Sequence, residues 1–196
     1  MKKNLPLSPR PVKNASLILL SFFLLAACMQ YDESLAPGDH RNGNALDVSS
    51  MESMAAMVKR TFTAHLNSAN EVNPNGVDSQ GQGQAIFTIS EDGTSIDYKL
   101  IAANTVDITQ AHIHCGAEGV NGPVVVFLFG FVTGGVTQNG VLAEGTITSA
   151  NIRPNVSCSG VTATYDLLVE LIRSGGAYVN AHTPTYPGGE IRGQIQ

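Results

Sequence analysis

Short stretches in which apolar and polar residues alternate recur from residue 61 to the end of the chain, and this pattern constrains the fold most. Residues 83–90 and 95–102 alternate on either side of residues 91–94, which contain the Asp-Gly pair typical of a hairpin turn. Residues 123–129 form a continuous apolar run, which indicates a central buried strand. The other segments with strand-like sequence are residues 62–66, 109–115, 141–148, 177–182 and 190–195.

These segments amount to about eight short strands separated by turns rich in Gly, Pro and Asn. That density predicts an all-β fold, an antiparallel β-sandwich. The spacing of the apolar residues departs clearly from this alternation in one segment. There, Tyr165, Leu168, Leu171 and Ile172 recur at spacings of three and four residues. This spacing predicts one short amphipathic helix near residues 162–174, ending at the glycine pair that follows.

The first 27 residues have a different chemistry. Four basic side chains precede an apolar segment, residues 16–25, which is shorter than the about 20 residues that a membrane span needs. Small residues follow, and this order is typical of a secretory signal peptide. The sequence Leu-Ala-Ala-Cys ending at Cys28 resembles the lipobox of bacterial lipoproteins, which implies cleavage before Cys28 and acylation of that residue. The alternative is an ordinary signal peptide with an unrelated cysteine.

The lipobox has consequences for localisation. Met29 follows the cysteine, and by the sorting rule of Gram-negative lipoproteins the lack of Asp here implies the outer membrane. We therefore expect a membrane-anchored protein in the periplasm or at the cell surface. Residues 28–60 have low hydrophobicity and no strand pattern, so they are predicted to be the lipidated cysteine and a flexible tether for a domain at residues 61–196.

The net charge limits the class of partner. Cleavage would remove four basic and no acidic side chains, which changes the formal charge from −5 to −9. An acidic surface repels the phosphates of nucleic acids. The expected partners are therefore the membrane, through the lipid anchor, and an unknown protein or small ligand, but no nucleic acid.

Two cysteines remain when Cys28 is assigned to the lipid. An even number of remaining cysteines, in a compartment expected to be oxidising, predicts a disulfide between Cys115 and Cys158. The alternatives are two free thiols, or Cys115 as a metal ligand beside the histidines that precede it.

His112 and His114 stand two residues apart in a predicted strand, so their side chains share one face. His182, Glu190 and Arg192 come from the last two predicted strands and would meet them if these strands are neighbours. One interpretation is a zinc or copper site formed by the three histidines, with Glu190 as a fourth ligand or as a partner of a ligand. The other is a structural network in which the imidazoles donate to Glu190 and to backbone carbonyls, and Arg192 pairs with Glu190.

Several sequence blocks resemble the CHRD domain, a module named for its repeats in chordin. They are residues 62–66, 70–72, 83–85, 111–116, 122–125, 177–183 and 187–195, of which the last two are the most specific. The resemblance covers residues 61–196 and implies a β-sandwich of the kind found in bacterial secreted proteins and lipoproteins. It implies no particular activity, and growth-factor binding by chordin would be carried over by analogy of fold alone.

Signatures of catalysis are lacking in the sequence, which has no Gly-x-Ser-x-Gly motif and no phosphate-binding loop. We therefore expect a lipid-anchored extracytoplasmic binding or structural module, without enzymatic activity and with an unknown partner. The alternative is a metal-binding protein that uses the histidine cluster, with redox or hydrolytic activity. His65 could join either arrangement of the histidines, and Arg192 could hold an anionic ligand in place of the ion pair.

Overall fold

The computed structural model describes residues 59–196. The predicted signal peptide, the lipidated Cys28 and nearly all of the predicted tether lie outside the described residues. None of the helices within residues 59–196 has the length and apolar character that a membrane-crossing helix needs.

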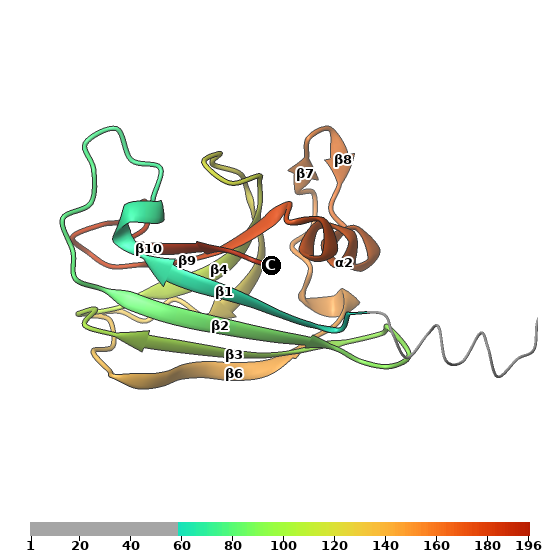
Figure 1. The fold of residues 1–196 in the computed structure, drawn as a ribbon, viewed down its shortest axis with the longest axis horizontal. Helices are drawn as coiled ribbons and strands as arrows, with labels where there is room; N and C mark the ends of the chain where they lie inside the picture. Colours follow the sequence, from blue (N-terminus) through green and yellow to red (C-terminus); the bar gives the residue numbers. More distant parts are fainter. Residues whose placement is uncertain (1–58) are drawn as a thin grey trace, which may run out of the picture. The chain divides into compact units, whose positions relative to one another are not determined.

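Eight antiparallel strands form one continuous sheet, in the spatial order β5-β4-β9-β10-β1-β2-β3-β6 (Figure 1). All eight predicted strands are present, and the prediction of an all-β antiparallel fold is confirmed. The strands are β1 (Thr61–Asn67), β2 (Gln82–Ile89), β3 (Ile96–Ala103), β4 (Gln110–Cys115), β5 (Val124–Phe129), β6 (Gly140–Ile147), β9 (Ala177–His182) and β10 (Ile191–Gln194). The smaller elements are η1 (Ser68–Asn70), η2 (Ser149–Asn151) and the pair β7 (Ser157–Cys158) and β8 (Val161–Thr162).

The sheet curves until its two outermost strands, β5 and β6, contact each other. The hydroxyl of Tyr98 on β3 donates to the carbonyl of Leu128 on β5 at 2.7 Å. The backbone N–H of Arg153, after η2, donates to the carbonyl of Val125 at 2.9 Å. One sheet therefore provides both layers of a sandwich-like fold, and the alternate apolar residues of its strands fill the space between them. The core includes Phe62, Ala64, Leu66, Ala85, Phe87, Ile89, Ile96, Leu100, Ile113, Val126, Leu128, Ile147, Val179 and Ile191.

The predicted helix is α2 (Tyr165–Ser174), which packs against β9 (Figure 1). Thr164 caps its start, because the side chain accepts a hydrogen bond from the backbone N–H of Leu167. Gly175 ends it in the left-handed conformation with a φ of 72°, and its N–H bonds the carbonyl of Leu171. The helix begins later than predicted because residues 161–162 belong to β8.

Candidate functional site

The polar side of β4, β9 and β10 is the most unusual surface of the fold. In these strands the odd-numbered residues face the apolar core, and the even-numbered residues face outward. Most of the outward residues are nevertheless buried, because loops 116–122 and 183–190 lie over them, and only Gln110 and Gln194 at the strand ends are partly exposed. Loop 116–122 closes so tightly on its own start that a Cβ at Gly122 would collide with the backbone carbonyl of Cys115.

Three histidines converge on this side. β4 and β9 are antiparallel neighbours, with Gln110 opposite His182 and His112 opposite Asn180, so all three imidazoles share one face. One potential ligand atom from each of His112, His114 and His182 lies within 4.8 Å of the other two. The alternation within β4 predicted the shared face of His112 and His114, and the pairing of β4 with β9 adds His182.

Hydrogen bonds assign the protons on these rings. His182 Nδ1 lies 3.0 Å from the carbonyl of Pro187, and His114 Nδ1 lies 2.8 Å from the carbonyl of Gly122. A carbonyl only accepts, so both Nδ1 atoms carry the proton. The Nε2 of His182 is then an acceptor, and His112 Nδ1 donates to it at 3.0 Å.

Each neutral ring therefore has a lone pair on Nε2. The Nε2 atoms of His112 and His114 are buried and have no hydrogen-bond partner in the described structure. A buried polar atom left without a partner costs about 1–3 kcal/mol. Such an atom fits a ligand that comes from outside the chain, such as a metal ion.

The surroundings of the rings keep them uncharged. His112 packs edge-to-face against Phe127 with 4.4 Å between ring centroids, and His114 stacks on Tyr178 at 4.8 Å. Burial is the main cause that lowers the pKa of His112 from 6.5 to about 3 and that of His114 to about 4. Burial also lowers the pKa of His182. All three imidazoles are thus neutral at neutral pH, which is the form that binds a metal ion.

Glu190, the proposed fourth ligand, is not among the residues whose ligand atoms converge. Its Oε1 accepts a hydrogen bond from the hydroxyl of Ser79, and its Oε2 accepts one from the hydroxyl of Thr183, both at 2.6 Å. The carboxylate therefore ties the loop before β2 to the loop between β9 and β10.

The predicted ion pair between Arg192 and Glu190 is wrong. The guanidinium of Arg192 donates to the side-chain oxygen of Asn121 at 2.9 Å and to the carbonyl of Val120 at 2.8 Å. It also lies 3.4 Å from the ring centroid of Tyr178. The two side chains separate because Arg192 reaches loop 116–122, whereas Glu190 contacts the loops on its other side.

One charged residue of this layer was not predicted as a site residue. Glu71, directly after η1, has a carboxyl oxygen that is buried without a hydrogen-bond partner. Burial raises its pKa from 4.5 to about 7, although the charge of Arg192 lowers it in part. No periodic pattern marks this loop residue, and its only sequence signal is its position in one of the blocks that resemble the CHRD domain.

The predicted disulfide between Cys115 and Cys158 is present and is confirmed. Cys115 is odd-numbered and faces the core, away from the neighbouring histidine rings, so it is not a metal ligand. Its bond fastens β4 to the β7–β8 hairpin.

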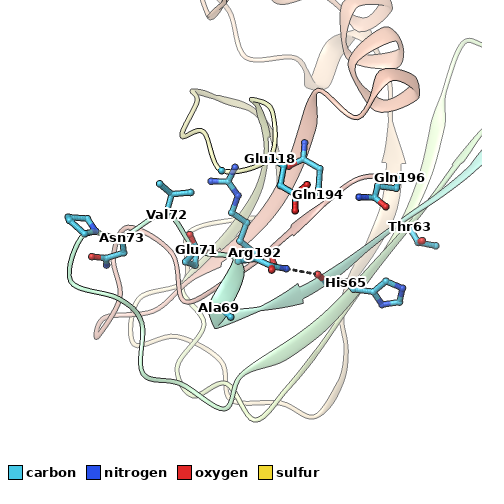
Figure 2. A pocket seen from close by; sticks show the side chains of 13 residues that line it. Thr63, His65, Ala69, Glu71, Val72, Asn73, Glu118, Arg192, Gln194 and Gln196 are labelled. Atoms are coloured by element: carbon cyan, nitrogen blue, oxygen red, sulfur yellow. Dashed lines mark hydrogen bonds between the residues drawn. The ribbon is translucent and has the colours of Figure 1, made fainter.

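His65 lies apart from the histidine cluster, in an open groove of about 860 Å³ between β1, β10 and loop 116–122 (Figure 2). The lining is largely polar and includes Thr63, Asn70, Glu71, Glu118, Gln194 and Gln196. It contains no aromatic side chain other than the imidazole of His65.

Comparison with known proteins identifies one family. The model of the CHRD domain family matches residues 62–195. Neither the curated proteins nor the solved structures contain a match. Since the family model spans well over half of the sequence, this chain belongs to the CHRD domain family.

Proposed function

We propose that this chain is a lipid-anchored extracytoplasmic module that binds a transition-metal ion at His112, His114 and His182. Membership of the CHRD family suggests an extracellular binding or structural module. The observation that carries the metal proposal is the convergence of three neutral imidazoles, of which two have buried Nε2 atoms without partners.

The hydrogen bonds of the rings support metal binding. Histidines that bind metals commonly donate their other N–H to a backbone carbonyl, which fixes the ring orientation. His114 and His182 do this through Gly122 and Pro187. A purely structural network would supply donors to the Nε2 atoms of His112 and His114 as well.

Binding requires a small adjustment of the cluster. Nitrogens that share one zinc ion at tetrahedral or trigonal angles are about 3.4–3.6 Å apart, because each zinc–nitrogen bond is about 2.0–2.1 Å. The ligand atoms lie up to 4.8 Å apart, so the rings would move together by about 1.2–1.4 Å. The ion would also replace the hydrogen bond between His112 and His182.

The metal proposal is tested on full-length protein purified without a histidine tag. After incubation with zinc or copper salts and removal of excess metal, we expect one ion per chain. The variant in which His112, His114 and His182 are all alanine should bind none, whereas His65→Ala, a histidine outside the cluster, should bind as the wild type does. Wild-type protein that retains no stoichiometric metal would refute the proposal and leave the histidines as a structural network.

The anchor proposal rests on the lipobox that ends at Cys28. Two acyl chains hold a protein stably on a membrane, where one does not. We expect Cys28→Ser to release the protein from the membrane fraction, and Met29→Asp to keep it membrane-bound but to change which membrane carries it. Unchanged membrane partitioning of Cys28→Ser would contradict the anchor.

A further inference from the structure

We infer that the ion held by His112, His114 and His182 is Cu(I) in preference to Zn(II) or Cu(II). This inference rests on the proposed metal-binding function and concerns the identity of the ion. It follows from the charge of the donors, the charges around them and the exclusion of solvent.

The donor set is electrically neutral. Three imidazoles converge, and no thiolate or carboxylate joins them within residues 59–196. The thiol of Cys115 is consumed in the disulfide, and both oxygens of Glu190 accept hydrogen bonds from hydroxyl groups. A bound ion would therefore keep its full formal charge in a buried place.

The surroundings add positive charge. Phe127 packs against His112, and the guanidinium of Arg153 lies 5.6 Å from the centroid of that phenylalanine ring. On the other side, Tyr178 stacks on His114, and the guanidinium of Arg192 lies 3.4 Å from the tyrosine centroid. Each aromatic ring beside the cluster thus has an arginine close to it.

Two carboxyls lie in the same layer as the cluster, and that of Glu190 is bound by the hydroxyls of Ser79 and Thr183 and does not join the histidine donors. The carboxyl of Glu71 interacts with Arg192 and, when ionised, offsets only that one charge. The cost of moving an ion from water into a buried site increases with the square of its charge. A divalent ion therefore meets a cost about four times that of a monovalent ion of the same size.

Coordination number leads to the same ion. The exposed fractions of His112, His114 and His182 are 3%, 7% and 7%. Zinc bound by three histidines normally keeps a water molecule as its fourth ligand, and Cu(II) prefers four ligands in a tetragonal arrangement. Three imidazoles complete the coordination of Cu(I) without water, which suits rings so well shielded from solvent.

The test compares the ions on the same untagged full-length protein. Cu(I), kept reduced with ascorbate, is offered in competition with the chromophoric chelator bicinchoninate, and Zn(II) is offered in competition with a zinc chelator. We expect one Cu(I) per chain and a dissociation constant at least about tenfold lower than that for Zn(II), a free-energy difference of about 1.4 kcal/mol. Loss of one ligand in His114→Ala or His182→Ala should weaken Cu(I) binding by at least about 10–100-fold, since even outer-shell changes have that effect. His65→Ala should bind like the wild type.

A second measurement needs no variant. We expect the copper-loaded wild type to be silent in electron paramagnetic resonance, and its X-ray absorption to show three nitrogen ligands and no sulfur. A strong Cu(II) signal, or tighter binding of Zn(II) than of Cu(I), would overturn the copper inference and leave the metal-binding function intact. Failure to bind either metal would overturn both.

Discussion

The two sides of β4, β9 and β10 are both largely shielded from solvent but differ in how they are filled. On the core side, Ile113, Val179 and Ile191 are 0% exposed and pack against other apolar residues. On the outer side, His112, Asn180 and Arg192 are 2–3% exposed and lie beneath loops. Apolar contacts do not require a particular direction or partner atom, whereas each buried polar atom needs a hydrogen-bond partner of its own.

That difference explains where the candidate site lies. The core side has no polar side chain to satisfy, so it offers stability and no chemistry. The outer side satisfies most of its polar atoms through the loops but leaves several without partners, including the Nε2 atoms of His112 and His114. Function is thus expected on the side whose hydrogen bonding is incomplete.

The largest effect is expected on the core side, at the disulfide that joins β4 to the β7–β8 hairpin. Replacing both Cys115 and Cys158 with serine opens a covalent loop with a sequence separation of 43 residues. In the chain-entropy model this lowers the free energy of unfolding by about 4 kcal/mol. Urea unfolding of the oxidised wild type and the double variant measures the loss, and superimposable curves would contradict it.

Adjacent residues on opposite sides of β4 should then differ in their effect on stability. Ile113→Ala leaves a cavity in the core and should lower the free energy of unfolding by about 2–5 kcal/mol. His112→Ala in metal-free protein leaves the buried Nε2 of His182 without its donor, which costs about 1–3 kcal/mol, but it also removes the Nε2 of His112 that had no partner. Denaturant unfolding of both variants provides the comparison, and a larger loss for His112→Ala would show that the polar side carries the fold.

Acid should weaken the polar side. The folded-state pKa values of His112, about 3, and His114, about 4, lie below the ordinary 6.5, so the unfolded chain binds the extra protons. Their contribution to stability is complete above pH 6.5 and is lost as the pH falls toward 4. Glu71 acts in the opposite direction, because its pKa is raised from 4.5 to about 7 and its contribution increases as the pH falls through that range.

The histidines outnumber the single carboxyl, so we expect a net loss of stability on acidification. The variant Glu71→Gln lacks the compensating proton uptake. Its free energy of unfolding should therefore fall more steeply than that of the wild type between pH 7 and pH 4.5. Parallel pH profiles of urea unfolding for the two proteins would show that Glu71 ionises normally in the fold.

The smallest effect is expected far from both buried sides. Lys99 and Glu144 form an ion pair at 3.3 Å between β3 and β6, with side chains that are 47% and 63% exposed. Exposed pairs of this kind contribute about 0.2–1 kcal/mol or less. Glu144→Gln should therefore change the unfolding midpoint only slightly, and less at high salt. If Glu144→Gln lowered the free energy of unfolding as much as Ile113→Ala does, the expected order of these effects would be wrong.

Local patterns predicted much of this molecule. The strand positions follow from alternation, the helix from its spacing, and the end of the helix from Gly175. The partner of Cys115 followed from the number of cysteines together with the expectation of an oxidising compartment. These features depend on neighbouring residues or on composition, so they do not require knowledge of the three-dimensional path of the chain.

The remaining features depended on which strands and loops become neighbours. Alternation in β9 predicts one side buried and the other in water, but loops 116–122 and 183–190 bury the second side as well. Glu190 and Arg192 are two residues apart on the sequence, and the loops around them give them different partners.

The sequence by itself determined that this chain forms antiparallel strands and that His112 and His114 share a face, because backbone geometry alternates side chains along any strand. The tertiary structure alone brought His182 to them, excluded Glu190 and placed Glu71 beside Arg192. The physical reason is that a metal-binding geometry depends on distances between segments far apart in the chain, and these are set by strand order and loop packing over the whole domain.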